Sequence, residues 1–162
     1  MEAMSNTAAA MIVALFLGTA AACTRQAEPA APPPYTPALG EIMTLTQMRH
    51  IKLWFAGQAA NWPLASYELD ELKEGFDDAA TYHAAHKDSP LPIDQLIPKM
   101  TTTPLQQLEE AVSAKDGAKF TQAYDALTDA CNSCHRATNF GFNVVSRPTG
   151  NPYANQLFQL PQ

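Results

Sequence analysis

Residues 118–138 read AKFTQAYDALTDACNSCHRAT, and this stretch decides how the rest of the chain is interpreted. Its large apolar side chains recur every three or four residues, which is the spacing of one stripe along an α-helix. The stripe consists of Phe120, Tyr124, Leu127 and Cys131. We therefore predict a helix over 118–138, and its buried stripe leads directly into two cysteines and a histidine.

Three other segments have helical spacing, and no alternating strand pattern follows Gly40. They cover residues 37–61, 64–86 and 93–114, and proline, glycine and polar breaks separate them. Helices of this length with short connections readily form an antiparallel bundle. The predicted fold class is therefore all-α, an antiparallel four-helix bundle within residues 39–142.

Prolines predict where two of these helices are interrupted. Pro63 should end or kink the first helix, because a proline ring obstructs the carbonyl group four residues earlier. Pro104 should divide the third helix into pieces over 93–100 and 103–114, with the hydroxyl groups of residues 101–103 as caps.

Length and composition exclude several classes of protein. The chain has 162 residues, enough for one domain with little left over. Hydrophobic residues make up 46% and charged residues 16%, so a buried core is expected rather than disorder. The net charge is -6 and the pI about 5.0, which argues against a surface that follows nucleic-acid phosphates.

The first residues have the pattern of an export signal. An apolar run over 8–22 ends in small side chains directly before Cys23, and it is too short for a membrane-spanning helix. We predict a signal peptide over 1–22 and a proline-rich linker over 23–38. The alanines before Cys23 resemble a bacterial lipoprotein processing site, so lipidation of Cys23 and ordinary cleavage nearby both stay open. The segment before the run carries Glu2 and no basic residue, which departs from the usual signal.

Residues 131–135 spell Cys-x-x-Cys-His, the attachment sequence for c-type haem. Two thiols three residues apart lie on one side of a helical turn, where they can add to the two vinyl groups of one porphyrin. The adjacent imidazole then lies beneath the iron. We therefore expect one covalent haem c, with thioethers from Cys131 and Cys134 and with His135 as the proximal ligand.

Two cysteines at this spacing could also form three other kinds of site, and each fits this sequence less well. A thioredoxin-like pair needs a helix N-terminus to lower the thiol pKa, whereas these cysteines follow a long stretch of helix. A structural zinc site needs two more ligands at suitable spacing, and the one close pair, His83 and His86, is expected to lie solvated at the end of the second helix. A disulfide across a two-residue gap within a helix is geometrically poor.

An exported four-helix chain with CNSCH near the end of its last helix resembles the cytochrome c prime family and its low-spin relatives. The resemblance covers residues 39–142. It implies that the first helix crosses the distal face of the haem, with Met43 at the place of the distal ligand. Met48 and His50 are the alternatives, and Trp54 is expected to pack near the porphyrin ring. Arg49 and Lys52 are candidate partners for the haem propionates, with a solvated role equally open.

The chain departs from that family after the motif. Residues 136–162 follow His135, and the part from Phe140 to Phe158 is too rich in apolar side chains for a frayed tail. We predict that this C-terminal extension, residues 143–162, folds back over a haem edge or a groove of the bundle.

The sequence thus predicts a periplasmic or periplasm-facing one-electron carrier that serves redox partner proteins and is not an enzyme. The alternative function is a five-coordinate haem protein that binds small gases such as NO or CO. A third reading is a lipoprotein without haem that has a structural or metal-delivery role. A homodimer that pairs through the first two helices also stays open.

Overall fold

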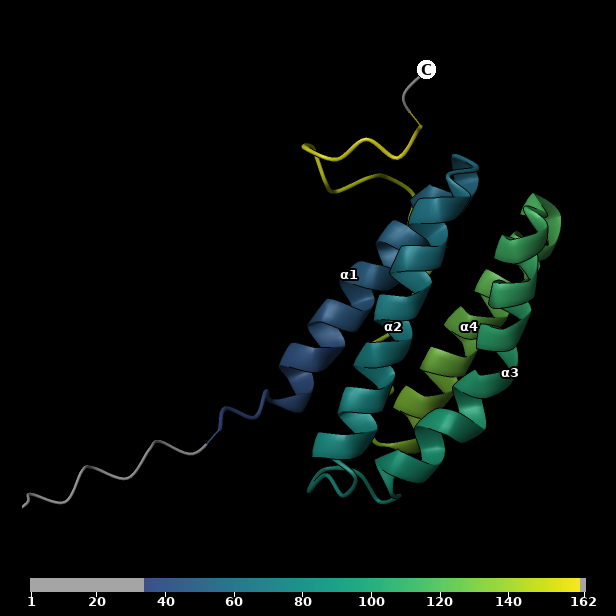
Figure 1. Cartoon of the computed structure of the whole chain (residues 1–162). Helices are drawn as coiled ribbons and strands as arrows, with labels where there is room; N and C mark the ends of the chain where they lie inside the picture. The colour runs from purple at the N-terminus through teal and green to yellow at the C-terminus, as the bar shows by residue number, and fades with distance from the viewer. Residues whose placement is uncertain (1–33, 161–162) are drawn as a thin grey trace, which may run out of the picture. The chain divides into compact units, whose positions relative to one another are not determined.

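The computed structural model describes residues 34–160, and all regular structure in this range is helical (Figure 1). The four helices are α1 (Leu39–Gln58), α2 (Trp62–Tyr82), α3 (Ile93–Ala114) and α4 (Gly117–Ala137). Consecutive helices run in opposite directions along the bundle (Figure 1). The predicted all-α four-helix bundle is therefore confirmed.

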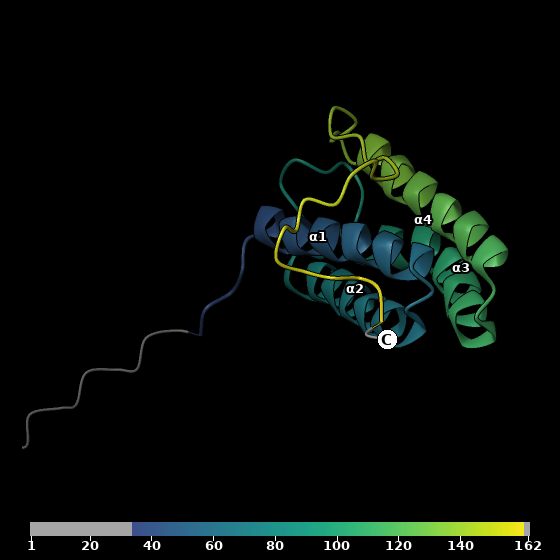
Figure 2. The same ribbon diagram turned by 90° about the horizontal axis from the view of Figure 1, so that it is seen from above.

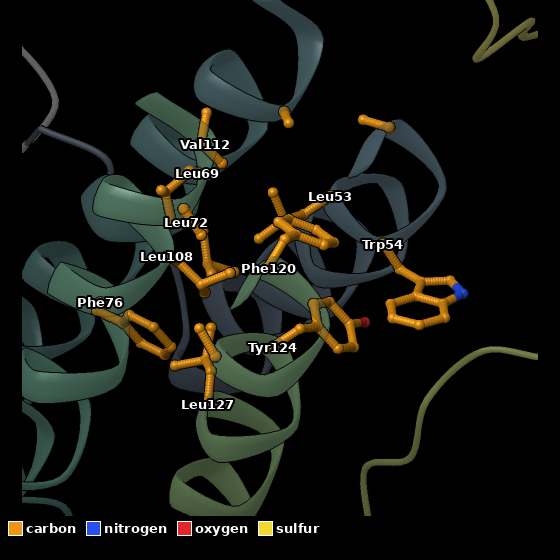
Figure 3. Close-up of a cluster of buried hydrophobic side chains, with 14 of the residues drawn as sticks. Leu53, Trp54, Leu69, Leu72, Phe76, Leu108, Val112, Phe120, Tyr124 and Leu127 are labelled. Atoms are coloured by element: carbon orange, nitrogen blue, oxygen red, sulfur yellow. The ribbon is translucent and has the colours of Figure 1, made fainter. Parts of the chain in front are cut away.

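The helices pack as two pairs. α1 packs mainly on α2 and α3 packs mainly on α4, while α2 and α3 join the pairs. Figure 3 shows the core that they enclose, in which side chains of α4 lie among apolar side chains of the other three helices. Tyr124, Phe120 and Leu127 are fully buried there. The stripe predicted for the last helix is thus the side of α4 that faces the core.

Polar side chains accept hydrogen bonds from free backbone N–H groups at the starts of α2 and α4, whereas α1 and α3 have no side-chain cap. The Asp116 carboxylate accepts hydrogen bonds from the backbone N–H groups of Ala118 and Lys119 at 3.1 and 3.0 Å, which caps α4. Asn61 caps α2 in the same way. Pro63 lies in the first turn of α2, where a missing N–H costs nothing. The expectation that Pro63 ends or kinks the first helix was therefore wrong, because α1 already ends at Gln58.

α3 is one continuous helix although it contains Pro98 and Pro104, so the predicted division at Pro104 was wrong. The threonine hydroxyls do not cap a second piece. Those of Thr101 and Thr102 donate instead to the carbonyl groups four residues earlier, at 2.8 and 2.6 Å. Pro104 is itself buried on the same stripe as Leu108. Packing of this stripe against the bundle outweighs the cost of the proline.

Two glycines allow α1 to approach its neighbours closely. A Cβ atom added to Gly57 would lie 2.1 Å from the Phe120 ring of α4, and one added to Gly75 would lie 2.7 Å from the Thr46 hydroxyl of α1. A side chain larger than hydrogen therefore does not fit at either crossing.

The segment after α4, residues 138–160, returns along the bundle as an irregular strap (Figure 2). It passes along α1 toward the opposite end, where Phe158 is buried against Phe55 with their ring centroids 5.4 Å apart. The Asn61 amide donates to the Phe158 carbonyl at 2.9 Å. The C-terminal extension thus folds back onto the bundle, with Phe158 buried at its far end.

The predicted signal peptide over 1–22, Cys23 and most of the linker lie outside the described residues. None of the helices within residues 34–160 has both the length and the apolar character that a membrane span requires.

Candidate functional site

A cavity of about 350 Å³ lies at the end of the bundle where α1 and α3 begin and α4 ends. Each of the four helices contributes to its wall, and so does the first part of the strap. Most of the lining is apolar. Leu39, Leu72, Phe76, Ile93 and Ile97 supply walls from the first three helices, and Phe140, Phe142 and Val145 supply walls from the strap. The cavity is therefore suited to an apolar group rather than to a strongly charged one.

The last two turns of α4 place Cys131, Cys134 and His135 together on this cavity. The two thiols form no disulfide. Burial raises the pKa of Cys131 to about 12, with the neighbouring Cys134 adding to the rise, and burial also raises the pKa of Cys134. A thioredoxin-like pair needs a lowered thiol pKa. The position of these cysteines at the C-terminal end of a helix, with raised pKa values, argues against that chemistry.

His135 is oriented by the strap. Its Nδ1–H donates to the backbone carbonyl of Asn143 at 2.6 Å. This bond fixes the tautomer, because the protonated nitrogen is the one that donates. Among the described residues, Nε2 of His135 has no hydrogen-bond partner. The lone pair of Nε2 is therefore left to bind a metal, which is the arrangement that metal-binding histidines in proteins typically show.

α1 forms a wall of the same cavity with Met43 and His50. Met43 is half-buried and packs against the edge of the hydrophobic core. Met48, an alternative ligand from the sequence, does not line the cavity. Of the two methionines, Met43 alone therefore lies where it could meet a group held by α4.

His50 is the other alternative ligand, and its ring is already bonded on both sides. Nε2 lies 2.9 Å from the Thr128 hydroxyl, and Nδ1 lies 2.9 Å from the Tyr124 hydroxyl. Burial lowers the pKa of His50 to about 4, so the ring is neutral at pH 7. With both nitrogens engaged, His50 anchors α1 to α4 and has no free nitrogen for a metal.

Trp54 does not line the cavity. It lies one turn beyond His50, deep between α1 and α4, with its ring centroid 4.9 Å from that of Tyr124. The guanidinium of Arg147 covers its other side at 4.6 Å from the ring centroid. Trp54 is therefore part of the packing that holds α1, α4 and the strap together.

Arg49 and Lys52 do not line the cavity either. Arg49 forms ion pairs with Glu68 at 3.2 Å and Glu71 at 2.6 Å. The Lys52 ammonium lies 5.1 Å from the ring centroid of Tyr153 in the strap. Both cations are thus engaged with α2 or the strap, and not with a group in the cavity.

His86 is a cavity residue that the sequence interpretation missed. It was expected to be solvated, but it is half-buried and lines the cavity, with its ring centroid 5.9 Å from that of Phe140. His83 is half-buried as well, and its Nε2–H donates to the Pro37 carbonyl at 2.8 Å. Both lie after the end of α2, where no helical period indicates which way a side chain points.

The described residues contain no cluster of three or more His, Cys, Asp or Glu side chains that could hold a metal ion. Cys131 and Cys134 therefore lack, within residues 34–160, the further ligands of a four-coordinate zinc site. No protein family model, no curated protein and no solved structure matches this chain.

Proposed function

We propose that the chain is a monohaem c-type cytochrome that carries single electrons between redox partner proteins. The observation that carries the proposal is the meeting of Cys131, Cys134 and His135 on one wall of an apolar cavity. Covalent haem attachment requires two thiols for thioethers and an imidazole for the iron, all on the same side of the bound group.

The residues of the cavity fit haem c in three further respects. Both thiols are unpaired and face the cavity. His135 keeps Nε2 free while its Nδ1–H is bonded to Asn143. The walls are largely apolar, which suits a porphyrin. Cys131 and Cys134 would hold the haem, His135 would be the proximal ligand, and Met43 on α1 would be the distal ligand.

When bound, haem supplies an iron that changes its oxidation state by one electron. The chain contributes the environment of that iron. The walls from the helices and the strap are largely apolar, and a methionine ligand favours a higher reduction potential than a second histidine does. The proposal includes export, because c-type haem is attached outside the cytoplasm. The same proposal covers the export signal over 1–22, a periplasmic location, a lipid anchor at Cys23 and pairing as a homodimer.

A second candidate function rests on the packing of Met43. Its side chain also contacts the edge of the hydrophobic core, and a methionine held there only by packing would leave the iron with five ligands. A five-coordinate haem binds small gases such as NO or CO. The two candidates therefore differ in one ligand and not in the mode of haem attachment.

Expression of the full chain together with the haem-attachment machinery tests the proposal. The expected product is red, gives the pyridine haemochrome spectrum of haem c, and exceeds the mass of the polypeptide by one haem. The Cys131→Ser/Cys134→Ser double variant should lose the covalent haem. A colourless wild-type product with the mass of the bare polypeptide would overturn the proposal. It would favour the hypothesis of a lipoprotein without haem.

The distal ligand is tested on the red protein. An electron carrier with methionine as the distal ligand gives a low-spin ferric spectrum with a weak sulfur-to-iron band near the red edge of the visible range. Met43→Ala should convert this spectrum to a high-spin one, whereas Met48→Ala is the matched control and should leave it unchanged. A wild-type spectrum that is already high-spin and responds to CO would favour the gas-binding function.

A further inference from the structure

The two variable positions of the Cys-x-x-Cys-His motif have different surroundings. The Asn132 side chain pairs with the backbone of Val145 in the strap through two hydrogen bonds. Its Nδ2 donates to the Val145 carbonyl at 2.8 Å, and the Val145 N–H donates to its Oδ1 at 2.8 Å. Ser133, by contrast, bonds only within α4, to the Asp129 carbonyl and to Arg136. The strap is therefore attached to the motif through Asn132.

This attachment lies two residues from the group that orients His135. Asn143, whose carbonyl accepts from His135 Nδ1–H, also donates its own N–H to the Phe140 carbonyl at 2.8 Å. The Phe140 N–H in turn donates to the His135 carbonyl at 2.8 Å. Residues 140–145 thus form a tight return whose near end is held by α4 and whose far end is held by Asn132.

The rest of the strap has its own anchors. Arg147 forms a two-point ion pair with Asp125 and covers the Trp54 ring, and Phe158 is buried at the opposite end of the bundle. Loss of the Asn132 amide should therefore release residues 143–145 locally without detaching the strap as a whole.

We propose that Asn132 is a positioning residue for the proximal ligand: through Val145 it holds the Asn143 carbonyl against His135, and so sets the electron donation of that imidazole to the haem iron. The inference rests on the proposed function. A ring N–H that donates to a fixed carbonyl makes the opposite nitrogen a stronger donor, which stabilises the more highly charged iron and lowers the reduction potential. The return also fixes the plane of the ring.

The test compares Asn132→Ala with Ser133→Ala in the red, haem-bearing protein. Both variants leave the two cysteines and the histidine of the motif in place. Two quantities are measured: the reduction potential, and the rate at which the His135 Nδ1–H exchanges with deuterium in nuclear magnetic resonance spectra. Asn132→Ala should raise the potential and speed the exchange roughly tenfold, the factor expected when hydrogen bonds of ordinary strength are lost. Ser133→Ala should change neither quantity.

A second pair of variants covers the case in which Asn132→Ala folds poorly. Asn132→Asp keeps an acceptor for the Val145 N–H but loses the donor to the Val145 carbonyl, so it should speed the exchange relative to both the wild type and Ser133→Asp. Ser133→Asp adds the same charge one residue away without touching the strap. The difference between these two variants then reports the hydrogen bond and not the charge.

The outcomes separate this proposal from the proposed function. A wild-type product without haem overturns both. A haem-bearing protein in which Asn132→Ala leaves the potential and the exchange rate unchanged, or changes them no more than Ser133→Ala does, overturns the positioning role alone.

Discussion

The Tyr124 hydroxyl of α4 lies 2.9 Å from Nδ1 of His50 on α1, and also 2.9 Å from the backbone carbonyl of His50. On the other side of the ring, the Thr128 hydroxyl lies 2.9 Å from Nε2. One buried, neutral imidazole is thus bonded to two side chains from consecutive turns of α4. These bonds connect two helices that contact each other less than the pairs α1–α2, α2–α3 and α3–α4 do.

The first prediction concerns the pH dependence of stability that His50 causes. Burial lowers its folded-state pKa from 6.5 to about 4, so between these values the unfolded chain binds a proton that the folded chain does not. Stability should therefore fall as the pH falls from about 6.5 to about 4, by up to about 3 kcal/mol. Urea unfolding of the wild type and of His50→Gln over this range measures the effect. The variant should be less stable at pH 7 and should show a shallower decline; equal slopes for the two chains would contradict the assignment.

The second prediction concerns the crossing of α1 and α4 at Gly57. An added Cβ atom would lie 2.1 Å from the buried Phe120 ring, so Gly57→Ala should lower the free energy of unfolding by about 2 kcal/mol through overpacking. Gly117→Ala is the matched control, since an added Cβ there meets no atom within 4 Å. Thermal unfolding should show a lower midpoint for the first variant and no loss for the second. Equal midpoints would show that a Cβ atom at Gly57 can be accommodated, and would contradict the prediction.

The third prediction concerns the far end of the strap. Phe158 is 4% exposed and packs on Phe55, whereas its neighbour Leu157 is 85% exposed. Phe158→Ala should cost about 2 to 4 kcal/mol of stability, and Leu157→Ala should cost close to nothing. Chemical denaturation measures both costs. If Phe158→Ala were as stable as Leu157→Ala, the strap would not be held at this end.

The fourth prediction concerns the ion pair of Arg49 with Glu68, whose side chain is only 1% exposed. Arg49→Ala leaves this carboxyl group buried without its closest cation and should cost about 2 to 3 kcal/mol. A second substitution, Glu68→Gln, should recover part of that loss because the buried charge is removed. Lys73→Ala breaks an exposed pair with Glu109 and should cost under about 1 kcal/mol. A double-mutant cycle measured by urea unfolding gives the coupling free energy between Arg49 and Glu68. Strictly additive losses of stability would show that the two residues are not coupled.

The main features of the fold could be predicted from the sequence because helical periodicity is a local property. Phe120, Tyr124 and Leu127 of the predicted stripe are buried on α4, and Cys131 is partly buried against the core. The helix ends were less predictable, since they depend on single polar side chains. Pro63 starts α2 rather than ending α1, and the buried stripe that contains Pro104 keeps α3 continuous. In both cases tertiary packing or capping outweighed the rule for an isolated proline.

The cavity could be predicted only in part. The α4 residues were indicated by the Cys-x-x-Cys-His motif, and Met43 by the family resemblance. His86 was missed because it follows the end of α2, where no period indicates the direction of a side chain. Trp54 lies four residues beyond His50 on α1, and its ring packs on Tyr124 of α4 rather than on the cavity. The acceptor for His135 is a backbone carbonyl, and a backbone group has no signature in the sequence.

The bond between His135 and Asn143 has a consequence for how short motifs are read. The five residues of CNSCH specify which atoms could bind a porphyrin. The acceptor that polarises the imidazole is the backbone carbonyl of Asn143, which lies outside them. Two chains with the same five letters can therefore differ in the electronic character of their histidines. It depends on which backbone segment packs beside the ring and accepts its N–H.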